Sequence, residues 1–159
     1  MGLIQLPDVK LSPDQHIVPL KYEHLTRLRL KEHEQEYARA IPRYIDYVWD
    51  NAVDGYSWAG IARGRVIAAF GLRFYWEGVA EAWMLPGEGI EKNAISVVRA
   101  TRHLFDIAIE ENRLRRVQIA VKVENDTAYK FAKAVGFGVE SVMRKFGPEG
   151  SDYYLMARF

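Results

Sequence analysis

One stretch of the chain, residues 116–137, constrains the fold more than any other. Residues 116–123 read Arg-Val-Gln-Ile-Ala-Val-Lys-Val, a short apolar run rich in β-branched side chains, which predicts a strand. Asn125 can then cap a helix by accepting an N–H bond, and Gly136 supplies the left-handed residue that ends many helices. Between them, one helical face carries the apolar residues Ala128, Phe131, Ala132 and Val135. The stretch therefore predicts a strand, a helix and the start of a further strand.

The rest of the chain predicts strands and helices in a mixed order. We expect strands at residues 15–20, 56–62, 65–76, 79–85, 137–146 and 153–159. One amphipathic helix is expected from Tyr22 through Leu25 and Leu28 to Tyr37, a second from Pro42 to Trp49, and a long one over residues 91–111. We interpret residues 1–159 as a single domain, since this length is typical of one domain.

The helix after Asn125 resembles the last helix of the GNAT superfamily, the acyl-CoA-dependent N-acetyltransferases. The family's pattern places Ala three residues after an Asn, an apolar residue at six, and Gly-Phe at eleven and twelve, a spacing that this chain reproduces. The matching residues are Asn125, Ala128, Phe131, Gly136 and Phe137. The order of strands and helices is also similar to the family's over nearly the whole chain. The tryptophan-rich plan loosely resembles acetyltransferase-like proteins of small tailed phages.

The resemblance implies an α/β (α+β) fold, with a GNAT-like mixed, mostly antiparallel seven-stranded sheet flanked by about four helices. The fourth and fifth strands, residues 79–85 and 116–123, are expected to diverge after Trp83 and to leave a cleft for the coenzyme. The implied activity is transfer of an acetyl group from acetyl-CoA to an amine of a small molecule or protein. Seven residues after the Asn, the family usually has a Tyr that protonates the coenzyme thiolate, whereas this chain has Ala132. An alanine methyl cannot donate a proton.

The loop before the long helix departs from the family's pattern. In the family this loop reads Arg or Gln, two residues, Gly, one residue, and Gly or Ala, and the next helix begins at the bound pyrophosphate. Here Pro86 takes the first position, Gly89 keeps the first Gly, and Glu91 replaces the last small residue. With Glu88, Glu91 would repel phosphates, which predicts weak and salt-dependent binding. Without the fold, the glycines describe a plain turn before a helix. The coenzyme-binding residues that the resemblance implies are Met84, Leu85, Gly87, Gly89, Lys92, Asn125 and Phe131.

Glu81 is the candidate general base. It is the only ionisable residue of the run 79–85, and burial among apolar neighbours would raise its pKa into the range that suits deprotonation of an amine. The alternative is an edge-facing or salt-bridged carboxylate, with Arg73 opposite it in the hairpin.

Tyr153 is the candidate general acid in place of Ala132. Tyr154 beside it, and Tyr129 on the preceding helix, could supply the proton instead. A structural role in the core or at an interface is the alternative for all three tyrosines.

Composition excludes several other classes of function. A net charge of +1 gives no field that favours nucleic acid, and the absence of cysteine removes disulfides, thiolate metal sites and cysteine nucleophiles. The four histidines show no metal-ligand spacing, so no metal is expected. Residues 1–7 lack the features of a signal peptide and no segment is long and apolar enough to span a bilayer, so we expect no membrane contact and a cytoplasmic location, the host cytoplasm if a phage encodes the chain.

Two functional hypotheses follow. The first is an N-acetyltransferase that binds acetyl-CoA and an amine acceptor, as a monomer or homodimer. The second is a GNAT-fold protein with reduced catalysis that acts by binding a protein partner. Ala132 and the altered loop favour the second hypothesis, and Asn125 favours the first.

Overall fold

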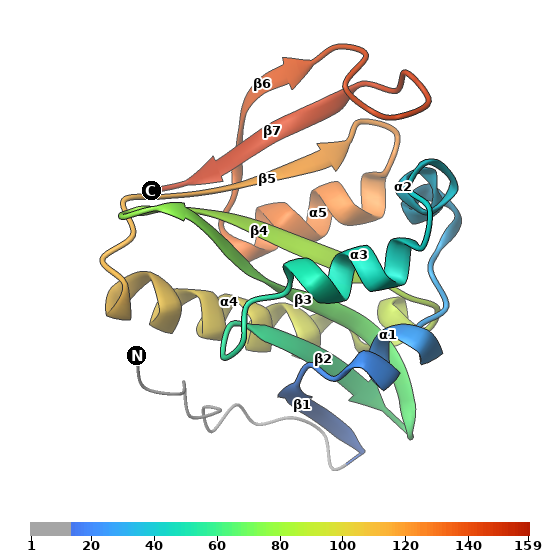
Figure 1. The fold of residues 1–159 in the computed structure, drawn as a ribbon. Helices are drawn as coiled ribbons and strands as arrows, with labels where there is room; N and C mark the ends of the chain where they lie inside the picture. Colours follow the sequence, from blue (N-terminus) through green and yellow to red (C-terminus); the bar gives the residue numbers. More distant parts are fainter. Residues whose placement is uncertain (1–13) are drawn as a thin grey trace.

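The computed structural model describes residues 14–159. Its centre is a seven-stranded sheet with the strand order β1-β2-β3-β4-β5-β7-β6 (Figure 1). In this sheet β4 and β5 are parallel, and the other neighbouring pairs are antiparallel. The mixed, mostly antiparallel sheet predicted from the sequence is confirmed. The strands are β1 (Gln15–Pro19), β2 (Ser57–Ala62), β3 (Arg65–Trp76), β4 (Val79–Pro86), β5 (Arg116–Lys122), β6 (Gly138–Met143) and β7 (Tyr153–Arg158).

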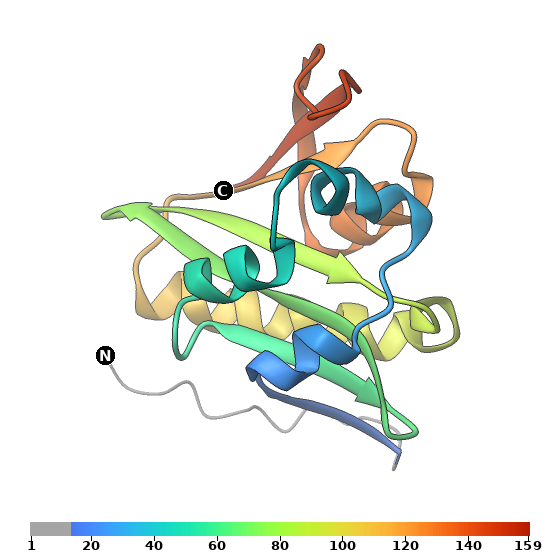
Figure 2. The same ribbon diagram turned by 45° about the vertical axis from the view of Figure 1, so that its right-hand side comes forward.

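Helices cover both faces of this sheet (Figures 1 and 2). Residues of α4 and α5 pack on one face, and residues of α1 and α3 pack on the other. None of the helices within residues 14–159 combines the length and apolarity needed to cross a lipid bilayer. The helices are α1 (Tyr22–Arg27), α2 (Gln35–Ala40), α3 (Tyr44–Asn51), α4 (Ala94–Glu111) and α5 (Asp126–Val135), with 3-10 turns η1 (Glu32–Glu34) and η2 (Ile90–Asn93).

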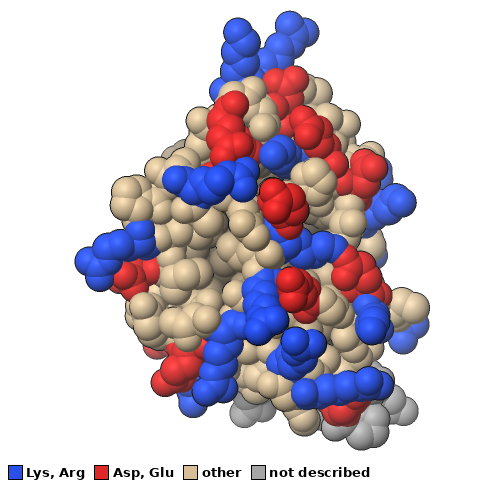
Figure 3. Space-filling view, turned by 90° about the vertical axis from the view of Figure 1, so that its right-hand side faces the viewer, with Lys and Arg blue, Asp and Glu red and all other residues tan. Residues whose placement is uncertain are grey.

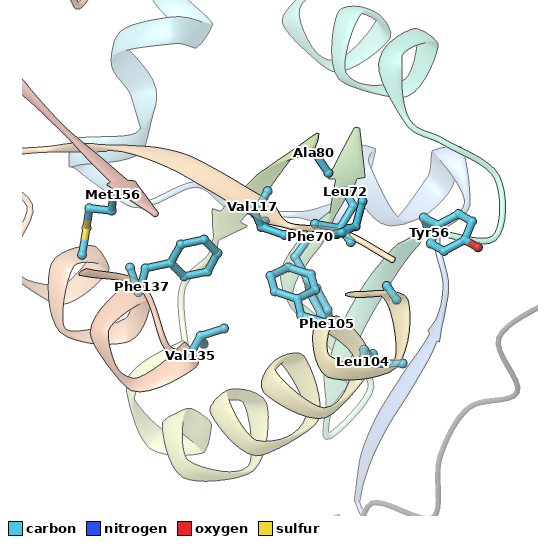
Figure 4. Packing of buried hydrophobic residues seen from close by; sticks show 14 of the residues in the cluster. Tyr56, Phe70, Leu72, Ala80, Leu104, Phe105, Val117, Val135, Phe137 and Met156 are labelled. Atoms are coloured by element: carbon cyan, nitrogen blue, oxygen red, sulfur yellow. The ribbon is translucent and has the colours of Figure 1, made fainter. Parts of the chain in front are cut away.

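Alternation along β3 divides the core into two layers, because successive side chains of a strand point to opposite faces. Phe70 and Leu72 are fully buried on the side of α4 and α5, whereas Ala69 packs with the α1 and α3 layer. Figure 4 shows Phe70 directed toward Phe105 of α4, and their ring centroids lie 6.2 Å apart in an edge contact. Burial of each such side chain contributes roughly 1.5–3 kcal/mol of transfer free energy. This packing anchors β3, the neighbour of β4 in the sheet, against α4.

The parallel pair β4 and β5 separates soon after it begins. Only three residue pairs are in register, ending at Glu81 opposite Gln118. Beyond that point β4 continues to pair with β3 and β5 with β7, so each strand keeps one backbone edge turned toward the gap. The predicted divergence is confirmed, but it follows Glu81 rather than Trp83.

The first predicted helix is wrong in its extent. The chain is helical from Tyr22 to Arg27, but Leu28 is extended, with φ −70° and ψ 126°. Leu30 then forms an isolated bridge with Gly87, and the Arg29 carbonyl accepts a hydrogen bond from the Glu88 N–H at 2.8 Å. These tertiary hydrogen bonds replace those of a continuous helix, so the chain restarts at η1 and α2.

The remaining boundaries differ from the predictions by a few residues. The long helix predicted from residue 91 begins with the turn η2 and becomes α-helical at Ala94. The strand predicted over residues 137–146 is paired only from Gly138 to Met143. The expectation for residues 1–7 lies outside the part of the chain that the structure describes.

Candidate active site between β4 and β5

The gap between the diverging strands holds a cavity of about 580 Å³. Its walls come from η1, α2 and α3 on one side of the sheet and from η2, α4 and α5 on the other, so it passes between β4 and β5. In the face turned toward the viewer in Figure 3, uncharged residues surround a hollow, with side chains of both charges around its rim. An apolar cleft with a few polar groups is the usual form of a small-molecule site.

Asn125 links the start of α5 to this cavity. Its side-chain Oδ1 accepts a hydrogen bond of 3.1 Å from the Ala128 N–H, which is the helix cap expected from the sequence. Its side-chain Nδ2 donates to the Glu34 carboxylate across 2.5 Å. Asn125 is buried with 6% of its surface exposed, so both contacts are partly shielded from solvent. The cap residue therefore also positions a carboxylate.

Glu34 is the most perturbed carboxylate of the cleft. Burial raises its pKa to about 7, although the hydrogen bond from Asn125 and the positive charges of Lys122 and Lys31 act in the opposite direction. A carboxyl group with a pKa near neutrality exists in both protonation states at physiological pH, which suits a general base. Glu34 was not predicted as a site residue, since nothing in its charged local sequence distinguishes it from its neighbours.

Glu81 also lines the cavity, on the sheet face that carries Trp83. It is partly exposed, and the Tyr75 hydroxyl donates a hydrogen bond to its carboxylate. Arg73 is its register partner on β3, but no ion pair joins the two in the described structure. Burial and this hydrogen bond raise the pKa of Tyr75 to about 12, so the tyrosine keeps its proton and Glu81 remains the acceptor.

Tyr153 borders the cavity, but its hydroxyl is already engaged. It donates to the Glu36 carboxylate at 2.9 Å, and only 3% of the residue is exposed. Burial and this hydrogen bond raise its pKa far above the ordinary value, which makes it a weak proton donor. Glu36 is fully buried and also meets the Lys122 ammonium at 3.3 Å and the Glu149 backbone N–H at 2.9 Å. The geometry favours a structural role for Tyr153.

The predicted coenzyme residues divide into two groups. Met84, Leu85, Asn125 and Phe131 line the cavity, as does Ala132. Gly87, Gly89 and Lys92 do not belong to its wall as the structure describes it, although their neighbours Pro86, Ile90 and Glu91 do.

Packing accounts for both glycines of the loop. A Cβ on Gly87 would lie 2.5 Å from a methyl of Leu28, and the Gly87 N–H donates to the Ile67 carbonyl at 2.8 Å. Gly89 adopts φ +92°, a conformation that favours glycine. Because the Gly87 and Glu88 amides already have backbone acceptors, those two donors are not available for a phosphate. Glu91 forms an ion pair with Lys31, so its charge is partly offset.

Three further cavity residues were also missed from the sequence. Tyr37 and Tyr44 come from α2 and α3, and Arg73 comes from β3. Arg73 was expected opposite Glu81 and is its register partner, but not as part of the site; helical periodicity could not place Tyr37 and Tyr44 opposite β4. Within residues 14–159, no group of three or more His, Asp or Glu side chains is arranged to hold a metal ion.

No protein-family model matches the sequence, and no curated protein matches it. The structure is nevertheless similar to solved acetyltransferases. Ard1 from Thermoplasma volcanium gives a TM-score of 0.73 at 15% identity, over 91% of this chain and 97% of that chain. A GNAT-family acetyltransferase from Bacillus anthracis gives 0.67 at 16% identity, over 94% and 96%. The yncA structure from Salmonella typhimurium, solved with its cofactor acetyl-CoA, gives 0.61 at 12% identity, over 91% and 93%. The chain has the GNAT fold.

In this example of the GNAT fold, the cleft is built from two sets of residues that are far apart in the sequence. Asn125, Phe131 and Ala132 come from the segment that gave the sequence resemblance. Glu34 and Tyr37 come from the interrupted N-terminal helical region, which the bridge between Leu30 and Gly87 turns toward the cleft. The site therefore depends on contacts that only the assembled GNAT fold creates.

Proposed function

We propose that the protein is an N-acetyltransferase that uses acetyl-CoA and acetylates an amine. The observation that carries this proposal is the open apolar cleft between β4 and β5, with Glu34 held in it by Asn125. The similarity to acetyltransferase structures, one of them solved with acetyl-CoA, supports the same activity.

The residues present fit a coenzyme A arm in the cleft. Beyond Glu81 and Gln118, β4 and β5 each have a backbone edge without a strand partner, and such edges can bond the amides of a pantetheine chain. Met84, Leu85 and Phe131 supply an apolar wall. The phosphates would meet Lys92 and the start of η2, where Glu88 and Glu91 oppose them.

The chemistry required of the protein is mainly proton transfer and positioning. Acetyl-CoA, when bound, supplies an acetyl thioester. Glu34 takes a proton from the acceptor ammonium, and Glu81 is the second candidate for this task. Ala132 supplies no proton for the departing sulfur, so that proton comes from solvent or from the acceptor itself. A missing general acid costs about a hundred- to ten-thousandfold in rate, which slows the reaction without preventing it.

A GNAT-fold protein that binds a protein partner without efficient catalysis is the second candidate. The engaged Gly87 and Glu88 amides favour it, together with Ala132. An origin in a small tailed phage, and action in the host cytoplasm, stay predictions that belong with this candidate.

A calorimetric titration with acetyl-CoA, followed by a screen of amines for thiol release, tests the proposal. We expect binding, and turnover that Glu34→Gln lowers while the exposed control Glu124→Gln does not. If the wild type neither binds acetyl-CoA nor acetylates any amine, the transferase proposal is refuted and the binding-protein candidate stands.

A further inference from the structure

Arg73 is a charged side chain of the cleft that forms no ion pair within residues 14–159. Arg73 lines the cavity from β3, and its guanidinium carbon lies 5.5 Å from the centre of the Trp83 ring. Its Nε is buried and has no hydrogen-bond acceptor. Glu81, which faces it in register, instead accepts a hydrogen bond from Tyr75. The guanidinium N–H donors of Arg73 thus have no acceptor within the described residues.

An unpaired guanidinium in an apolar cleft is costly, because its charge has lost part of its hydration without gaining a counter-ion. The Trp83 ring offsets this cost only in part, since a cation–π contact satisfies no N–H donor. Arginine binds carboxylates through two parallel hydrogen bonds, which is the interaction that this geometry leaves open.

Glu34 and Tyr44 line the same cavity as Arg73 and interact with it electrostatically. Burial raises the pKa of Tyr44, the negative charge of Glu34 raises it further, and the positive charge of Arg73 lowers it. Tyr44 is therefore within electrostatic reach of both groups. Its ring stacks on Tyr47, with centroids 6.3 Å apart and planes 19° from parallel, so the space near the two charges also has an aromatic wall.

We propose that the acceptor is an amino acid with an apolar side chain. Its amine would face Glu34 and Glu81, its carboxylate would bind Arg73, and its side chain would pack against Tyr44 and Tyr47. The inference rests on the proposed transferase function for its catalytic consequence, but the binding of a carboxylate by Arg73 can be measured without any turnover.

The first test measures ligand binding. N-acetyl derivatives of leucine, phenylalanine and tryptophan, each as free acid and as amide, are titrated calorimetrically into the wild type. We expect the acids to bind about ten- to a hundredfold more tightly than the amides, as for a charge-assisted hydrogen-bond pair. Arg73→Gln should remove the difference and Arg73→Lys should keep part of it. Arg65→Gln, an exposed change on the same strand, should leave it unchanged.

The second test measures acetylation of matched acceptors: the free amino acid, its amide, the amine without a carboxylate, and a peptide beginning with the same residue. The free amino acid should have the highest kcat/KM. Equal binding of acids and amides, an equal effect of Arg73→Gln on both, or a preference for the peptide would overturn the inference. Loss of acetyl-CoA binding with the acid preference intact would refute the proposed function and leave the carboxylate site standing.

Discussion

At the scale of single residues, environment shifts the pKa values of two nearby carboxylates in opposite directions. Glu34 is partly enclosed and its pKa rises to about 7, whereas the fully buried Glu36 has a lowered pKa. Burial alone would raise the pKa of Glu36, but the Glu149 amide, the Tyr153 hydroxyl and Lys122 stabilise its charge more strongly. Two glutamates only two positions apart in the chain thus have pKa values shifted in opposite directions.

Glu34→Gln should lower the rate of acetylation and raise the free energy of unfolding at high pH. The wild-type kcat/KM should increase as pH rises through about 7, because the base works when deprotonated, and the variant should lack this limb and lose about a hundredfold or more in rate.

A raised carboxyl pKa also means that stability falls as pH rises from about 4.5 to about 7. The variant should therefore be more stable by on the order of 2–3 kcal/mol at pH 8, with little difference near pH 4.5. Urea unfolding at the two pH values measures this, and an unchanged pH–rate profile would remove Glu34 as the base.

Ala132→Tyr should increase turnover, because the register set by Asn125 and Gly136 directs this position into the cavity. We expect a gain of at least about tenfold, below the full value of a well-placed acid. Ala132→Phe is the matched control, since it adds the same ring without the hydroxyl. Both variants must remain folded at the assay temperature, because only 4% of Ala132 is exposed. An equal effect of Tyr and Phe would show that the hydroxyl supplies no proton.

At the scale of secondary-structure elements, the loop between β4 and α4 connects the β4 wall of the cleft to the N-terminal helices. Gly87 packs under Leu28, Glu88 bonds the Arg29 carbonyl and Glu91 pairs with Lys31. These contacts hold the loop and also use groups that a phosphate would otherwise meet. The loop therefore favours rigid positioning over strong phosphate binding.

Glu88→Gln and Glu91→Gln should each tighten coenzyme A binding, and the effect should be larger at low salt. Each removes one negative charge near the expected phosphates, and Glu91→Gln also releases the Lys31 ammonium. We expect roughly three- to tenfold per change in low-salt calorimetry. Glu110→Gln, at the far end of α4, is the control. The same affinity for all variants in both buffers would place the phosphates away from this loop.

Tyr153→Phe should destabilise the protein with little effect on turnover. Removing the hydroxyl leaves the buried Glu36 carboxylate one donor short, which costs about 1.5–3 kcal/mol in the free energy of unfolding. Tyr154→Phe, whose ring contacts Tyr129, should cost less. Chemical unfolding and steady-state kinetics separate the two quantities. If the folded Tyr153→Phe variant is inactive, Tyr153 is the general acid predicted from the sequence.

At the scale of the whole molecule, the cleft exists because the sheet consists of two antiparallel parts that are joined only over a short length. β1 to β4 form one antiparallel run and β5 to β7 form another, and only three residue pairs join them. Side chains of α4 and α5 lie on one side of the β4–β5 junction, and side chains of α2 and α3 lie on the other. A ligand in the cleft would touch both halves.

Acetyl-CoA should therefore raise the melting temperature as it bridges the halves. At a hundredfold excess over Kd, linkage adds about 2.7 kcal/mol, which corresponds to roughly 5–10 °C for a domain of this size. AMP, which lacks the pantetheine arm, should give a much smaller shift. Differential scanning fluorimetry measures both, and equal shifts would indicate that the cleft between β4 and β5 is not where the coenzyme binds.

The order of the strands, most of the helices and the α5 cap at Asn125 could be predicted from the sequence, and the family resemblance added the divergence of β4 and β5. The element order and the cap follow from short-range periodicity and capping, as in residues 116–137, whereas the divergence came from the resemblance alone. It also placed Met84, Leu85 and Phe131 on elements that line the cleft.

The positions of the charges in the cleft could not be predicted, because they depend on tertiary contacts. The break after Arg27 comes from backbone bonds to the distant residues Gly87 and Glu88, and it carries Glu34 to Asn125, 91 positions away in the chain. The raised pKa of Glu34 and the unpaired guanidinium of Arg73 likewise follow from burial and from the partners that the fold supplies or withholds. Local periodicity contains no information on such long-range contacts, because they depend on which faces meet after the sheet and helices have packed.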